Sequence, residues 1–65
     1  MYPKEFDYIN SLGVPKKLVV YEKTNGVYPV VLWEMVHGEF VGSGELTPQK
    51  LNDYLAHFHI NKKFK

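Results

Sequence analysis

Three histidines and the acidic residues near them are the side chains best suited to metal or acid–base chemistry in this sequence. The histidines are His37, His57 and His59, and the nearest carboxylates along the chain belong to Glu34, Glu39 and Asp53. A metal site needs three or four such ligands to converge. His57 and His59 are two residues apart, which on a helix points them to different sides, and we expect His37 in a turn. We therefore predict no metal site and no cofactor.

Nucleophilic chemistry has equally few candidates. Ser43 lies between Gly42 and Gly44 in an expected strand, whereas a nucleophile elbow places its serine in a strand-to-helix turn. The same three residues are too short for a phosphate-binding loop, and Ser11 stands near the end of an expected helix. A chain of 65 residues also has little room for a deep substrate pocket. We therefore expect a protein that is not an enzyme.

Length and composition predict one folded domain. The chain has 65 residues, 45% of them hydrophobic and 23% charged, with a net charge of +1 and no cysteine. These values exclude a disordered chain, a disulfide scaffold and a thiolate metal cluster. The longest apolar run, Val30–Trp33, is too short to cross a membrane, and no apolar signal-peptide core follows Met1, so we expect a cytoplasmic protein. We place the domain at residues 1–60 and expect a basic, frayed tail at 61–65.

Two amphipathic helices are expected, one near each end of the chain. The first spans Tyr2–Leu12, where Pro3 suits the first turn and apolar side chains recur at helical spacing. Gly13 then reads as the left-handed residue that closes a helix. The second helix follows Thr47, a good N-cap, and begins with Pro48. Its apolar stripe consists of Leu51, Tyr54, Leu55 and Phe58.

Three strands are expected between these helices. They span Lys17–Thr24, Val27–Val36 and Glu39–Glu45. The turns at Asn25-Gly26 and His37-Gly38 join them into an antiparallel meander. The predicted fold is therefore α+β in the order α-β-β-β-α, a three-stranded antiparallel meander with two helices packed on one face.

The first of these turns predicts the strand register. A two-residue turn at Asn25-Gly26 places Lys17 opposite Glu34, a favourable cross-strand pair. Pro29 cannot donate a ladder hydrogen bond. We therefore expect a bulge at that position, or a wider loop from Lys23 to Pro29 from which Tyr28 projects.

In this register both faces of the sheet are apolar. One face carries Leu18, Val20, Val31, Trp33, Met35 and Phe40. The other carries Val19, Tyr21, Val30, Leu32, Val36 and Val41, with Glu34 among them. A half-exposed antiparallel sheet normally alternates apolar and polar residues, and two short helices cover only one face. The alternative is that the helices pack on opposite faces, or that a bulge turns some of these side chains away.

An uncovered apolar face is typical of a protein interface. We therefore expect a small non-enzymatic protein-interaction module. Its expected contact residues are Tyr21, Tyr28, Val30, Leu32 and Val41. The expected partner is a second copy, giving a homodimer, or a different protein, since self-association is a common remedy for a small core. Size and composition also suit a phage or mobile-element modulator that binds a host protein.

Nucleic-acid binding is the alternative function. All eight basic residues are lysines, and the candidate contacts are Lys16, Lys17, Lys50, Lys62 and Lys63. The expected α-β-β-β-α order resembles that of double-stranded-RNA-binding domains and of small RNA-targeting toxins, which implies recognition of RNA through its shape and phosphates. The basic cluster that starts the last helix of such domains is represented by Lys50 alone, and the toxins' histidine-bearing strand motif is missing. The lack of arginine and the low net charge also favour a protein partner.

Overall fold

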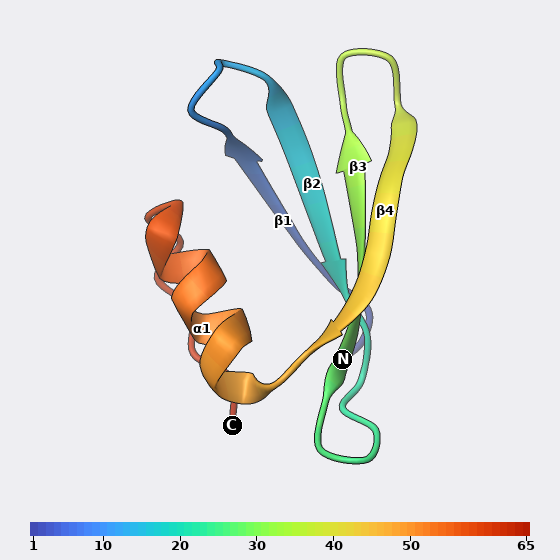
Figure 1. Ribbon diagram of the computed structural model, residues 1–65, viewed down its shortest axis with the longest axis vertical. Helices are drawn as coiled ribbons and strands as arrows, with labels where there is room; N and C mark the ends of the chain where they lie inside the picture. The colour runs from blue at the N-terminus through green and yellow to red at the C-terminus, as the bar shows by residue number, and fades with distance from the viewer.

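The computed structural model describes residues 1–65 as a four-stranded antiparallel sheet with one helix (Figure 1). The strands pair in chain order and are β1 (Lys4–Ile9), β2 (Pro15–Val20), β3 (Tyr28–Glu34) and β4 (Glu39–Leu46). The helix is α1 (Pro48–His57). The prediction of three strands and two helices is therefore wrong, while the α+β class and the antiparallel sheet are confirmed.

The N-terminal segment forms a strand because its side chains alternate between the two sides of the sheet. Phe6 and Tyr8 are half-buried, whereas Glu5, Asp7 and Ile9 are exposed. Aromatic and β-branched residues favour such a half-buried strand. An isolated helix of this length is marginal in water, whereas every residue of β1 pairs with a residue of β2. Tertiary pairing thus overrides the helical spacing.

A tight turn joins β1 to β2. The side chain of Asn10 accepts hydrogen bonds from the backbone N–H groups of Leu12 and Val14, both at 2.9 Å. Gly13 has a φ of +80°, the left-handed region that glycine enters without strain. The sequence signal at Gly13 is therefore correct in conformation, but it belongs to a hairpin and not to the end of a helix.

Strands β2 and β3 pair one residue away from the predicted register. Lys17 lies opposite Trp33, and not opposite Glu34. Thr24 and Val27 do form a bridge around the expected turn. However, the β2 side carries one more residue than the β3 side between that bridge and the regular ladder. The predicted irregularity exists, but its extra residue lies on the strand opposite Pro29.

A slip of one residue moves a strand's side chains to the other face of a sheet. The face toward α1 carries Leu18, Val20, Val30 and Leu32. The opposite face carries Val19, Val31 and Trp33. The predicted division, which grouped Val31 and Trp33 with Leu18 and Val20, is therefore wrong for β3.

Helix α1 begins as its sequence predicts. The Thr47 side chain accepts a hydrogen bond from the backbone N–H of Lys50, and Pro48 occupies the first turn. Leu51 and Leu55 are fully buried against the sheet. In Figure 1 the helix follows the end of β4 and lies along one side of the sheet, where Tyr54 and Phe58 pack against Tyr8 of β1.

The chain after α1, and not the predicted N-terminal helix, packs beside α1 on the sheet. Phe64 is only 7% exposed and packs edge-on against Tyr28. Asn52 of α1 donates to the Phe64 carbonyl at 2.9 Å and accepts from the Phe64 N–H at 2.7 Å. The Tyr28 hydroxyl donates to the carbonyl of Lys65 at 2.7 Å. Residues 61–65, expected to be frayed, therefore lie against the same side of the sheet as α1.

Candidate protein-binding face

The sheet face that points away from α1 and the C-terminal tail is the main candidate for a binding site. We call it the open face. Its apolar residues are Val19, Tyr21, Val31, Trp33, Met35 and Phe40, and its polar residues include Glu5, Asp7, Lys17, Ser43 and Glu45. The buried apolar cluster, which includes Leu51, Leu55 and Phe64, lies on the other side of the sheet. No second layer of the chain therefore covers the open face.

A shallow hollow of about 340 Å³ lies on the open face. Val19, which is only 7% exposed, lines it together with the aromatic side chains of Tyr21 and Trp33. Pro3 and Met35 lie at its border. The hollow therefore offers apolar contact area between aromatic side chains, a common arrangement at protein interfaces.

Trp33 and Phe40 form the aromatic part of this face next to the edge strand. They pair across β3 and β4, with ring centroids 5.9 Å apart and ring planes at 78°. The register shifts beside them, and Val41 is the extra residue of the resulting bulge. Phe40 is 58% exposed, so much of its apolar surface remains available to a partner.

One ion pair lies at the polar border of the open face. The Lys17 ammonium lies 3.0 Å from a Glu5 carboxylate oxygen across β1 and β2. This hydrogen bond, followed by the charges of Glu5 and Asp7, raises the pKa of Lys17 above its ordinary value. Exposed pairs of this kind add little to stability. The pair does mean that Lys17 is already engaged within the chain.

The structure divides the five predicted contact residues between the two sides of the sheet. Tyr21 lies exposed on the open face, and Val41 is exposed in the bulge of β4. Tyr28, by contrast, is 4% exposed and belongs to the core with Val30 and Leu32. The one-residue slip between β2 and β3 explains this division, because it exchanges the two faces of β3.

Because of the slip, the predicted register also missed residues that lie on the open face. Trp33, Met35 and Phe40 were expected under the helices, but the structure places them on the uncovered side. Pro29 was the sequence signal of an irregular turn, together with the loop from Lys23 that it predicted. This signal did not reveal which of the two strands carried the extra residue.

A second apolar hollow, of about 250 Å³, lies on the opposite side of the sheet between α1 and β4. Leu32, Leu46 and Tyr54 line it, and Gly42 and Gly44 supply parts of its wall without side chains. An added Cβ atom would meet nothing within 4 Å at either glycine. This hollow exists because α1 lies beside β1 and leaves the β4 side of the core partly open (Figure 1).

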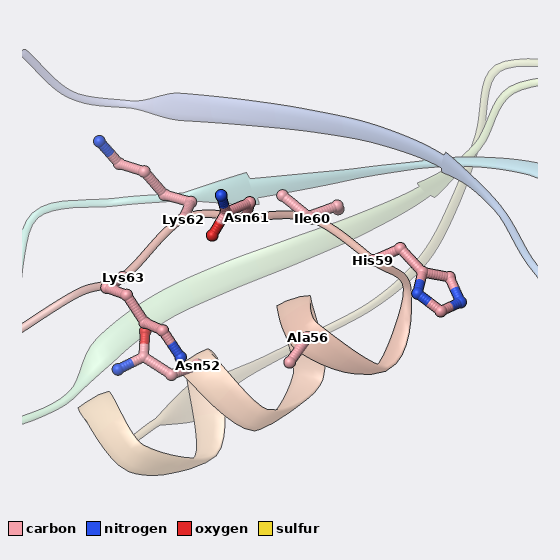
Figure 2. A pocket seen from close by; sticks show the side chains of 7 residues that line it. All are labelled: Asn52, Ala56, His59, Ile60, Asn61, Lys62 and Lys63. Carbon is pink, nitrogen blue, oxygen red and sulfur yellow. The ribbon is translucent and has the colours of Figure 1, made fainter.

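The five lysines proposed for nucleic-acid binding do not share one surface. Lys16 and Lys17 are consecutive in β2, so they point to opposite faces. Lys50 lies in the first turn of α1. Lys62 and Lys63 lie in the tail, where they border a polar hollow of about 270 Å³ beside α1 (Figure 2).

The histidines are separated in the same way. His57 ends α1, and His59 follows it with a φ of 63°. His37 lies in the β3–β4 turn, as expected, between the carboxylates of Glu34 and Glu39. Burial, which would raise the pKa of Glu34, is outweighed by hydrogen bonds from the backbone N–H groups of Val36 and His37 and by the His37 ring, so this pKa lies below its ordinary value.

Comparisons with protein-family models, curated proteins and solved structures found no match to the chain. The only helix, α1, has 10 residues and lacks the length and apolar character needed to span a membrane. The functional conclusion therefore rests on the geometry of the open face.

Proposed function

We propose that this protein is a small non-enzymatic interaction module that binds a second copy of itself through the open face. The observation that carries the proposal is the exposed apolar surface that Tyr21, Met35 and Phe40 form around the half-buried Trp33. Exposed apolar patches beyond a few hundred Å² usually mark interaction sites. The other side of the sheet already has α1 and the tail packed on it.

The size of the open face suits a small symmetric dimer. Four strands at their usual spacing are about 19 Å wide, and six to eight residues extend about 20–26 Å, giving roughly 400 Å² in projection. With its rim of side chains, such a face buries on the order of 1,000 Å² in a pair of copies, near the lower limit for a specific interface. Interfaces at this lower limit belong mostly to weak, transient complexes, so we propose a dissociation constant on the order of micromolar.

The residues of the open face are also compatible with a two-fold axis. A two-fold interface joins the same patch on both copies, so the patch must complement itself. The open face has apolar residues at its centre and charges of both signs around them, Lys17 together with Glu5, Asp7 and Glu45. Two such sheets pack face to face at about 10 Å, with their strands within about 30° of parallel.

Nucleic-acid binding remains the second candidate function, with less support. Phosphate binding needs several cations on one surface, and the structure distributes the candidate lysines over both sheet faces, the helix start and the tail. Size and composition still suit a phage or mobile-element modulator of a host protein in the cytoplasm. In that case the open face is the surface that the host protein would contact.

Sedimentation equilibrium of the pure chain tests the proposal. We expect a mass that rises from one to two copies over roughly 1–500 µM, since this range brackets a micromolar constant. The association should change little between 50 and 500 mM salt, because apolar contacts carry it. A single-copy mass throughout this range would refute self-association, and a steep loss at high salt would favour a charge-driven contact.

A further inference from the structure

The β3–β4 turn brings together an imidazole and two carboxylates outside the open face. Glu34 ends β3, Glu39 begins β4, and His37 lies in the turn between them. The Nδ1 atom of His37 is 3.4 Å from Oε2 of Glu34 and 3.7 Å from Oε1 of Glu39. One ligand atom from each of the three residues lies within 4.8 Å of the others.

These separations suit a transition metal ion. Tetrahedral zinc with bonds of about 2.0–2.1 Å holds its ligand atoms about 3.3–3.4 Å apart. The two distances from His37 lie close to that value, and small side-chain rotations bring the three atoms around one ion. Three protein ligands leave a fourth position for water, as in open zinc sites.

The strand register provides a second, separate reason to expect a cation here. Glu34 and Glu39 are direct cross-strand partners, and like charges in that position destabilise a hairpin. Lys16 lies opposite Glu34 on the other side, in β2, but the two residues form no ion pair. A cation bound between the carboxylates of Glu34 and Glu39 would offset their repulsion and stabilise the hairpin.

The backbone of the turn holds the ligands in place. Gly38 has a φ of +69°, which lets the chain reverse and return Glu39 to the side of His37. The Glu34 carboxylate accepts hydrogen bonds from the backbone N–H groups of Val36 and His37. Such supporting hydrogen bonds orient a ligand before the metal arrives.

We propose that Glu34, His37 and Glu39 bind one divalent transition metal ion of the zinc class. An imidazole with two carboxylates favours Zn²⁺ and, by the general order of affinities, Cu²⁺ still more. Mg²⁺ and Ca²⁺ prefer sites built from oxygen ligands alone. The ion would close the exposed end of the β3–β4 hairpin. This inference is independent of the proposed dimer.

The only tryptophan provides a direct readout. Trp33 precedes Glu34, and its ring packs against Phe40, which follows Glu39. Paramagnetic Cu²⁺ at the proposed site should therefore quench the tryptophan fluorescence. We expect saturable quenching with one ion per chain, competition by Zn²⁺, and no competition by Mg²⁺. Zn²⁺ should also raise the melting temperature, because it binds only the folded hairpin.

Variants of His37 and Glu39 test whether these residues bind the metal ion. His37→Gln should lower the apparent Cu²⁺ and Zn²⁺ affinities at least tenfold, and Glu39→Gln should also lower them. Both side chains are exposed, so circular dichroism should show an unchanged fold. The matched control is the double variant His57→Gln/His59→Gln, which removes the other two histidines and should keep the wild-type affinities.

Three outcomes would overturn the inference. The first is no saturable Cu²⁺ or Zn²⁺ binding up to millimolar concentration. The second is an affinity that His37→Gln leaves unchanged. The third is a loss of binding in the His57→Gln/His59→Gln control with retention in His37→Gln, which would place the ion at the end of α1 instead.

Discussion

Trp33 and Phe40 pack edge to face across β3 and β4, 5.9 Å apart between ring centroids, on the side of the sheet that no other part of the chain covers. In a monomer much of the surface of this pair is exposed to water. Aromatic residues at the centre of an apolar patch commonly supply most of an interface's binding energy. The pair is therefore the place where a substitution should separate binding from folding.

Substitution of Phe40 by glutamate should break the dimer without unfolding the chain. The side chain is 58% exposed, so the folded monomer loses little packing. In the dimer the same change buries a charge against apolar residues. We expect the dissociation constant to rise at least tenfold in sedimentation equilibrium, about 1.4 kcal/mol or more.

Leu12→Glu is the matched control for this prediction. Leu12 is 85% exposed but lies in the β1–β2 turn, outside the open face. The Leu12→Glu variant carries the same new charge at an apolar position that is even more exposed than Phe40, and it should dimerise like the wild type. Equal effects of both substitutions would mean that general surface hydrophobicity, and not the open face, drives association.

The C-terminal tail should contribute strongly to stability, because Phe64 fills the core beside Tyr28. Phe64→Ala should lower the free energy of unfolding by about 3 kcal/mol, the lower end of the range for buried phenylalanine. Urea unfolding followed by circular dichroism measures this loss. Lys63→Ala, an exposed neighbour, should change stability by less than about 0.5 kcal/mol. Similar small effects in both variants would show that the tail is not docked in solution.

Loss of the helix cap should have a smaller effect. Thr47→Ala removes the side-chain oxygen that accepts the Lys50 N–H at 3.3 Å, and we expect a loss of about 1 kcal/mol. Ser43→Ala changes an exposed hydroxyl in β4 and serves as the control. The same urea titration measures both variants. A destabilisation by Ser43→Ala as large as that by Thr47→Ala would contradict the capping role.

Stability should fall at high pH in a way that depends on Tyr8. Burial, and then the hydrogen bond and proximity to Tyr54, raise the pKa of Tyr8 above its ordinary value of 10.0. A raised pKa means that folding favours the neutral phenol. Its contribution is complete below the unfolded-state pKa and is lost as the pH rises through the folded-state pKa.

The test compares the wild type with Tyr8→Phe. Unfolding measured from pH 9 to 12 should show a shallower decline of stability above pH 10 in the variant, because it lacks this ionisable group. Absorbance at 295 nm, which follows tyrosine ionisation, should show that the variant has lost a tyrosine hydroxyl that ionises only at high pH. Identical pH profiles would contradict the coupling of Tyr8 to the fold.

Local signals in the sequence predicted helix α1 well. Thr47 and Pro48 are a cap and a first residue whose preferences depend on the helix start alone. The N-terminal segment was misassigned because its apolar residues fit both a helical and an alternating period. Pairing with β2 decides between the two, and a window of eleven residues does not contain that partner.

Only part of the candidate binding face could be predicted from the sequence, for a similar reason. The sequence correctly indicated more apolar sheet surface than its helix could cover. Which residues lie on the uncovered side depends on one extra residue before the Asn25-Gly26 turn. That single position decided whether Leu32 or Trp33 faces outward. The docking of Phe64 depends on Asn52, Tyr28 and the sheet, so no local sequence pattern could predict it.

Contacts between copies provide the most direct test of the open face as an interface. Isotope-filtered NMR on a mixture of ¹³C-labelled and unlabelled chains detects only contacts between different molecules. We predict such contacts from the Trp33 and Phe40 rings to the methyl groups of Val19 and Val31 of the other copy. The absence of any such contact at about 1 mM protein, or contacts confined to the Leu46 and Tyr54 side of the sheet, would contradict this assignment.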